Sequence, residues 1–133
     1  REKKAAPRGE PGRLDGLRIL AIDDEDVPLD LISAYLGNCD CKVVTARSGQ
    51  EGLDRIRSES WDVILTDRAM PGVSGDQVAA EAREHLPDVP LLMLTGFGDL
   101  MTCRKEQPAG VRAILSKPFT EDELRQAIEQ ALD

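Results

Sequence analysis

Short apolar runs alternate along this chain with segments of helical period, and this alternation constrains the fold more than any other feature. The apolar runs predict five strands, at Leu17 to Ile22, Lys42 to Ala46, Asp62 to Thr66, Val89 to Leu94 and Val111 to Ser116. Repeated strand and helix units of this kind form a parallel sheet with helices on both faces. We therefore predict an α/β fold with a doubly wound, five-stranded parallel sheet.

Side chains that can cap a first turn mark where the helices begin. Capping boxes pair Ser48 with Glu51, Ser74 with Gln77 and Thr120 with Glu123. Asp26 is expected to cap the first helix, two residues before Pro28. A short helix is expected at about Asp99 to Glu106. In the last helix, polar residues including Glu129 are expected to face water, and an apolar stripe should pack on the sheet: Leu124, Ala127, Ile128, Ala131 and Leu132.

The first 13 residues differ in composition from the rest of the chain. They hold five basic and two acidic residues and lack apolar periodicity, so we interpret 1–13 as a linker from a longer chain and 14–133 as the domain. The domain carries 12 basic and 23 acidic residues, so no nucleic-acid binding is expected. No apolar run approaches the ~18 residues of a membrane span, so no membrane contact is expected. Three cysteines without zinc spacing favour free thiols and a cytoplasmic protein.

Polar side chains follow four of the predicted strands at the point where each strand ends. Asp23 and Asp24 come directly after the first strand, Asp67 after the third, Thr95 after the fourth and Lys117 after the fifth. In open α/β sheets, ligands bind beyond the carboxyl ends of the strands, where the strand order reverses. With the order 2-1-3-4-5, the first and third strands are neighbours. Their three carboxylates would then share one pocket.

A pocket of three carboxylates is costly unless it takes up a cation. Two like charges ~4 Å apart repel by about 4 kcal/mol at an effective dielectric near 20. A small set of hard oxygen ligands suits Mg²⁺, which prefers one or two carboxylates together with a phosphate oxygen. Lys117 and Thr95 can bind the other oxygens of such a phosphoryl group. Asp67 is then placed to attack phosphorus and form an aspartyl phosphate.

Four motifs together resemble a known family. They are Asp23-Asp24, TDRAMPG at Thr66 to Gly72, LTG at Leu94 to Gly96 and SKPF at Ser116 to Phe119. In order, spacing and strand context they resemble the receiver domain of two-component response regulators, over about Leu17 to Leu132. The resemblance implies a flavodoxin-like (βα)5 fold with strand order 2-1-3-4-5.

The resemblance also implies a metal site. Asp67 matches the family's phosphoacceptor, and Asp24 matches a direct ligand of Mg²⁺ or Mn²⁺. Asp23 matches a ligand that acts largely through water, and the backbone carbonyl of Ala69 matches a further ligand.

Thr95 matches the switch hydroxyl of the family, and Lys117 matches its phosphate-binding lysine, followed by a cis bond to Pro118. The implied phosphodonor is a phosphohistidine on a histidine kinase or a histidine phosphotransfer protein. The domain would catalyse its own phosphorylation and dephosphorylation and would otherwise not be an enzyme. LTGFGD at Leu94 to Asp99 also resembles the C-terminal receiver of a hybrid sensor histidine kinase. A lone regulator is the alternative.

Rival functions remain to be weighed against a phosphoacceptor. Phosphatases of the haloacid dehalogenase type need an acid two residues after the nucleophile, where this chain has Ala69. A flavodoxin would place phosphate beside Asp23 and Asp24, which would repel it, and a P-loop motif is absent from the sequence. A receiver-like interaction module that is never phosphorylated stays open. The chain also departs from the family at Ile114, where an aromatic switch residue is usual.

Overall fold

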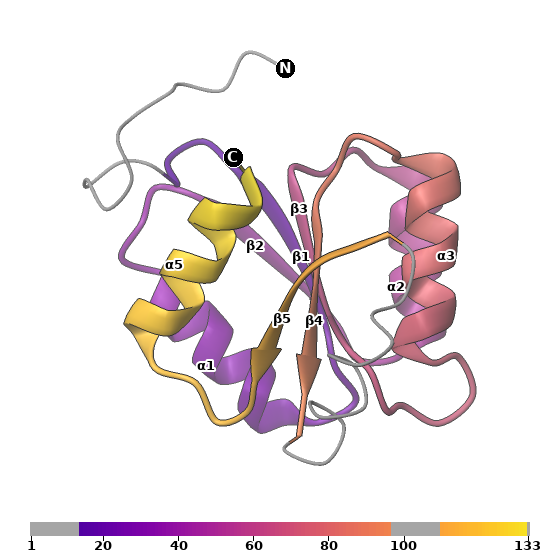
Figure 1. Cartoon of the computed structure of the whole chain (residues 1–133), viewed down its shortest axis with the longest axis horizontal. Coiled ribbons are helices and arrows are strands. Elements are labelled where there is room, and N and C mark those ends of the chain that lie inside the picture. Colours follow the sequence, from indigo (N-terminus) through magenta and orange to yellow (C-terminus); the bar gives the residue numbers. More distant parts are fainter. Residues whose placement is uncertain (1–13, 97–109, 133) are drawn as a thin grey trace.

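Both faces of a five-stranded parallel sheet are covered by helices in the computed structural model, which describes residues 14–96 and 110–132 (Figure 1). The strands are β1 (Arg18–Ile22), β2 (Lys42–Ala46), β3 (Val63–Asp67), β4 (Leu91–Thr95) and β5 (Val111–Ser116). The helices are α1 (Asp26–Leu36), α2 (Gly49–Ser58), α3 (Gly75–His85) and α5 (Glu121–Leu132). The order β2-β1-β3-β4-β5, with every pair parallel, confirms the predicted fold class and strand order. The helix expected near Asp99 to Glu106 lies outside the described residues.

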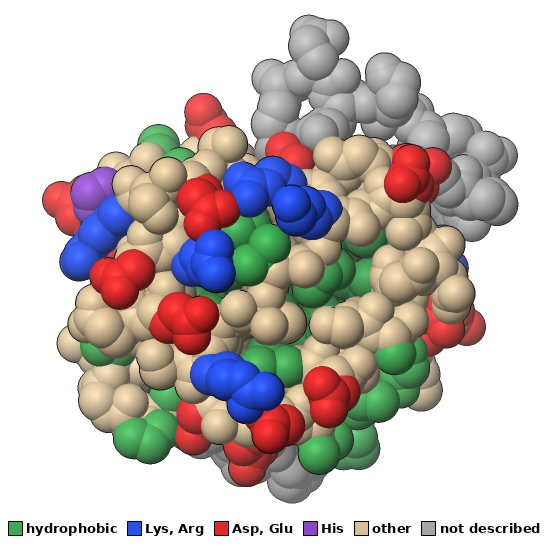
Figure 2. All heavy atoms as spheres, turned by 180° about the vertical axis from the view of Figure 1, so that it is seen from behind, with side chains coloured by type: hydrophobic (Ala, Val, Ile, Leu, Met, Phe, Trp, Pro, Cys, Tyr) green, Lys and Arg blue, Asp and Glu red, His purple; other side chains and the backbone are tan. Residues whose placement is uncertain are grey.

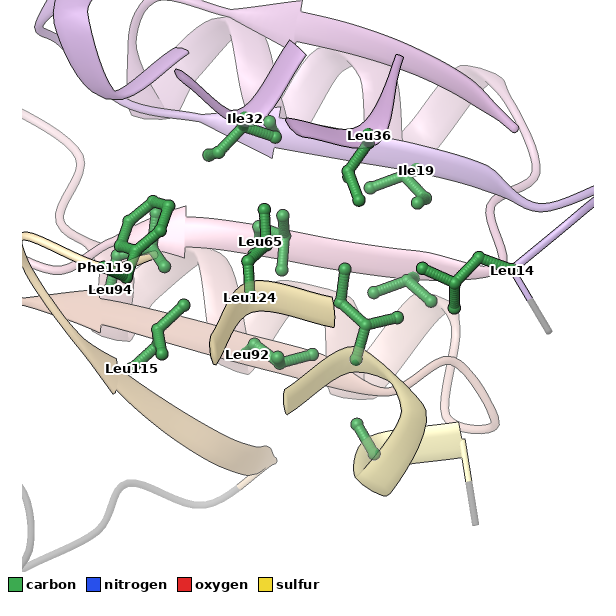
Figure 3. Packing of buried hydrophobic residues seen from close by; sticks show 14 of the residues in the cluster. Leu14, Ile19, Ile32, Leu36, Leu65, Leu92, Leu94, Leu115, Phe119 and Leu124 are labelled. Atoms are coloured by element: carbon green, nitrogen blue, oxygen red, sulfur yellow. The ribbon is translucent and has the colours of Figure 1, made fainter. Parts of the chain in front are cut away.

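Alternate residues of the central strands point to opposite faces of the sheet, so each of these strands contributes side chains to two hydrophobic cores, one on each face. On one face, α1 and α5 pack over side chains such as Ile19, Leu65 and Leu92 (Figure 3). On the other face, α2 and α3 cover a second cluster that contains Leu20 and Ile64. All residues of β3 and β4 are buried, as expected for strands covered on both sides.

The predicted caps of the later helices are present. The boxes at Ser74 and Thr120 are complete. At Ser48 only half of the predicted box forms: Ser48 Oγ accepts a hydrogen bond from the Glu51 amide at 3.0 Å, but the Glu51 carboxylate accepts from the Arg47 amide instead. The prediction for Asp26 was wrong. Glu25 occupies the cap position without a side-chain cap bond, whereas Asp26 is the first helical residue and its carboxylate pairs with Arg47 at the end of β2.

One prediction for the last helix was also wrong. Glu129 was expected to face water but is 2% exposed. The helix contacts β4, β5 and α1, so its buried surface is wider than the apolar stripe alone would cover. The apolar residues Leu124, Ile128 and Ala131 are buried as predicted.

Acidic and basic side chains are interspersed on the face drawn in Figure 2. Partly exposed ion pairs at the surface include Arg57 with Glu81 at 3.0 Å and Arg55 with Glu59 at 2.8 Å. Such pairs contribute little stability individually, so the two cores dominate the fold. Among the helices within 14–96 and 110–132, none has the length and apolar character needed to cross a bilayer.

Candidate functional site

Three aspartates meet where the carboxyl ends of β1 and β3 lie side by side. Asp23 follows β1, Asp67 is the last residue of β3, and the pairing of Ile22 with Thr66 sets these strand ends level. Each carboxylate of Asp23, Asp24 and Asp67 offers an oxygen within 4.8 Å of the others. Asp23 and Asp67 are buried, while Asp24 is exposed. The structure therefore gathers the acidic set that the strand order predicts.

Lys117 reaches this cluster from the loop after β5. Its Nζ lies 3.0 Å from Asp23 Oδ2 and 3.0 Å from Asp67 Oδ1, which makes it a bridge between the two buried carboxylates. Its backbone amide donates to the Thr95 carbonyl at 2.8 Å, which ties the loop to the end of β4. The Lys117–Pro118 peptide is cis, as the family resemblance implies.

The pKa values of these groups follow from burial and from the lysine. Burial raises the pKa of Asp23 and of Asp67 above its ordinary value, and hydrogen bonding to Lys117 counteracts this only in part. Burial alone would lower the pKa of Lys117, but hydrogen bonds with Asp67 and Asp23 raise it overall. One charged lysine thus faces three carboxylates. The cluster keeps an excess of negative charge that a divalent cation can neutralise.

The Thr95 hydroxyl is a buried donor at the end of β4. Thr95 has no exposed surface, and its Oγ1 has no hydrogen-bond partner within the described part of the chain. A buried hydroxyl that lacks a partner costs about 1–3 kcal/mol, so such groups are usually retained for a purpose. Its place on the strand between Asp67 and Lys117 in the sheet suits it to donate to an anion bound there.

The loop between β3 and α3 is held tightly behind Asp67. The Arg68 amide donates to the Leu94 carbonyl at 3.1 Å, and the Gly75 amide donates to the Arg68 carbonyl at 2.8 Å. The Arg68 guanidinium also pairs with Asp76, at 3.2 Å and 3.3 Å. The Arg68 side chain is only 22% exposed. No sequence spacing signals this pair, because it depends on how α3 returns to the strand.

The oxygen donors of the cluster fit a magnesium ion. Asp23, Asp24 and Asp67 supply hard carboxylate oxygens without nitrogen or sulfur, which is the chemistry that Mg²⁺ prefers. Ala69 is exposed on the loop directly after Arg68, two residues beyond Asp67.

A second group of possible metal ligands lies at the end of α3, formed by Glu81, Glu84 and His85. Within it, Glu81 Oε2 is already engaged by Arg57 at 3.0 Å and by His85 at 2.8 Å. The acidic cluster at the ends of β1 and β3 is therefore the stronger candidate site.

With this fold and site, the chain belongs to the family of response regulator receiver domains, whose sequence model matches residues 19–129. Over 115 residues it is 35% identical to the transcriptional regulatory protein GlrR of Escherichia coli K12, and the match covers 86% of this chain but 26% of that protein. It is 30% identical over 121 residues to the transcriptional regulatory protein ZraR of Salmonella typhimurium, covering 91% of this chain and 27% of that protein. The chain thus spans about a quarter of the length of these relatives.

Solved structures give the same family. A response regulator receiver domain protein from Clostridium thermocellum superposes with a TM-score of 0.79 at 36% identity, covering 87% of this chain and 94% of that one. The chemotaxis response regulator CheY4 of Vibrio cholerae superposes with a TM-score of 0.80 at 27% identity, covering 87% and 98%. Both comparisons extend over nearly the whole of a solved chain, so the domain itself is shared and not only a fragment of it.

Proposed function

We propose that this chain is the phosphoacceptor of a two-component phosphorelay, and that Asp67 receives the phosphoryl group. The observation that carries this proposal is the position of Lys117 Nζ, 3.0 Å from carboxylate oxygens of both Asp23 and Asp67. A lysine held at that point can bind a phosphoryl oxygen as soon as Asp67 bonds to phosphorus. We infer that the donor is a phosphohistidine on a histidine kinase or a histidine phosphotransfer protein.

In the phosphoryl transfer, the protein forms only one covalent bond, and its other residues position and stabilise the phosphoryl group. An oxygen of Asp67 forms a bond to phosphorus while the bond between phosphorus and the donor's imidazole nitrogen breaks. Asp23, Asp24, Asp67 and the Ala69 carbonyl would hold Mg²⁺, which supplies positive charge against the incoming phosphoryl oxygens. Lys117 pairs with one of these oxygens as a point charge, and the Thr95 hydroxyl donates a hydrogen bond to another.

The phosphoryl group then acts as a local charge switch. It adds nearly two negative charges beside Lys117 and Thr95, whose backbones are joined by a hydrogen bond of 2.8 Å. Thr95 ends β4 and Lys117 directly follows β5, so their rearrangement biases the conformation of this side of the domain. Ile114, half-buried on β5 against the core under α2 and α3, stands where the family usually carries an aromatic residue. We propose that switching proceeds without an aromatic rotamer change.

The test is to incubate the whole chain with a small-molecule phosphodonor, such as acetyl phosphate, and to weigh the intact protein by mass spectrometry. We expect a single phosphoryl adduct in the presence of Mg²⁺ and at least a tenfold lower yield with excess chelator, because the acidic cluster then repels the donor. The same donor without metal is the matched control. Absence of any adduct with Mg²⁺ would favour the alternative, a receiver-like interaction module that is not phosphorylated.

Magnesium binding should stabilise the fold, and the gain should shrink in acid. At saturating Mg²⁺ we expect about 1–3 kcal/mol of added stability near neutral pH, since the ion binds only the folded cluster. Burial raises the pKa of Asp23 and Asp67 above the ordinary value of 3.8. Falling pH therefore protonates both carboxylates before it protonates ordinary aspartates, and protons displace the ion.

In the metal-free protein, Asp23 and Asp67 should have the opposite effect: their contribution to the stability of the fold should grow as the pH falls. A raised pKa in the folded state gives a stability contribution that is complete below pH 3.8 and is lost as pH rises through the raised value. Thermal unfolding between pH 4 and pH 8, with and without Mg²⁺, measures both trends. An Asp26→Asn variant is the control, because that carboxylate pairs with Arg47 outside the cluster. A magnesium gain that does not change with pH would contradict the proposed ligand set.

A further inference from the structure

Two cysteines lie two residues apart in the turn that joins α1 to β2. Cys39 and Cys41 are both half-buried, and the residue between them, Asp40, is exposed. Both cysteines pack against the core cluster under α1 and α5. Their side chains therefore lie on the same, inward side of the turn, while Asp40 between them is exposed.

Hydrogen bonds hold the turn at Cys39 and Asp40. The Cys39 amide donates to the Leu36 carbonyl at 3.0 Å, and the Asp40 amide donates to Asp15 Oδ1 at 3.1 Å. The Asp40 carbonyl accepts from the Gly16 amide at 2.7 Å. Cys41 Sγ also lies 3.5 Å from the Leu36 carbonyl oxygen, so a single carbonyl contacts both cysteine residues. The two thiols are thus presented by a held turn.

The two thiols also interact with one another. Burial raises the pKa of Cys41 to about 11, and the neighbouring Cys39 adds to that increase. Burial raises the pKa of Cys39 too, but there Arg125 of α5 and a hydrogen bond with Cys41 act in the opposite direction. The Cys41 thiol is also held by the Leu36 carbonyl, so Cys39 is the one placed to react first. Both stay protonated at neutral pH, so they react slowly and only with a sustained oxidant.

We propose that Cys39 and Cys41 form a redox modification site, which closes to an intramolecular disulfide when a low-molecular-weight disulfide such as glutathione disulfide accumulates. The Cys39 thiolate attacks one sulfur of the oxidant and expels the other as a thiolate, which takes up the proton that Cys39 lost. The Cys41 thiolate then attacks Cys39 Sγ, forms the protein disulfide and expels the second small thiol with its proton. Two protein thiols are oxidised, and one oxidant disulfide is reduced to two thiols.

This site is separate from the acidic cluster. The cluster lies at the carboxyl ends of the strands, whereas Cys41 directly precedes the first residue of β2, Lys42. Closure replaces the contact of Cys41 Sγ with the Leu36 carbonyl, which keeps its bond from the Cys39 amide. A disulfide that spans a single residue closes a very small ring, and strained or exposed disulfides are the easily reduced ones. The modification is therefore reversible by small thiols.

The experiment equilibrates the full chain with mixtures of reduced and oxidised glutathione at pH 8, then quenches with acid, alkylates under denaturing conditions and weighs the intact protein. The reduced chain has three alkylatable cysteines, and closure should leave one while removing two hydrogens from the mass. Because the turn orients both thiols, the equilibrium constant for forming the disulfide should be at least about fivefold larger in the folded chain than in urea. A Cys103→Ser variant should close like the wild type.

Variants at the pair distinguish this reaction from other oxidation. Cys41→Ser and Cys41→Ala should each stop at a mixed disulfide with glutathione on Cys39, and circular dichroism should show that they remain folded. The proposal is overturned if the wild type also stops at the mixed disulfide, if closure requires Cys103, or if unfolding in urea favours closure. None of these results depends on whether Asp67 is phosphorylated.

Discussion

An Asp67→Asn variant should show no phosphoryl adduct under conditions that fully label the wild type, a loss of at least about a hundredfold. The amide has the size and shape of the carboxylate but lacks the anionic oxygen that attacks phosphorus. Lys117 also lies 3.0 Å from Asp23, so the loop after β5 should retain an anchor in this variant. Intact-protein mass spectrometry measures the loss.

Loss of the fold should not explain that result. Burial and the neighbouring acids Asp23 and Asp24 all raise the pKa of Asp67, which means that its charged form is disfavoured in the folded protein. Removing this charge should leave the metal-free variant at least as stable as the wild type, and thermal unfolding checks this. Asp26→Asn, at the start of α1, should label normally. Labelling of Asp67→Asn at the wild-type level would place the phosphoryl group on a different residue.

The acidic cluster could be predicted from the sequence because its members are set by strand ends. Strand positions follow from local apolar runs, and a parallel sheet brings all carboxyl ends to one edge. Once the order β2-β1-β3-β4-β5 was assumed, Asp23 and Asp67 had to be neighbours, and the pairing of β1 with β3 makes them so. The same rule brings Lys117, which begins the loop after β5, to that edge, but its contacts with Asp23 and Asp67 depend on how the loop folds back across β4.

The two wrong predictions concern charged residues, Asp26 and Glu129, whose neighbours come from distant parts of the sequence. A carboxylate near a helix start can cap the helix or can bind a nearby cation, and only the fold places Arg47 beside Asp26. A polar residue on the flank of a helix stripe faces water only if a single partner covers the helix. Because α5 contacts both α1 and the sheet, Glu129 is buried despite its charge.

The sequence also did not reveal how closely the backbone of α3 approaches β3 at Gly75. Gly75 follows the capping residue Ser74, so the pattern marks it only as the first residue of a helix. In the structure its Cα faces the backbone of β3, where a Cβ would lie 2.2 Å from the Asp67 carbonyl oxygen and 2.7 Å from Arg68 Cα. The absence of a side chain is thus a requirement of how closely α3 approaches the phosphoacceptor strand.

A Gly75→Ala variant should therefore lose about 3 kcal/mol of unfolding free energy, measured by urea denaturation. Alanine favours a helix over glycine by about 1 kcal/mol, but the clash is with backbone atoms that no rotamer change can move, so the steric cost dominates. Gly96→Ala is the matched control, because a Cβ there meets nothing within 4 Å, and its stability should change by less than about 1 kcal/mol. Since relief of the clash must shift Asp67 or α3, phosphoryl labelling at Asp67 should fall in Gly75→Ala even at temperatures where the variant is folded. An equal stability for the two alanine variants would show that α3 can move away from β3 freely, and that the position of Asp67 does not depend on this contact.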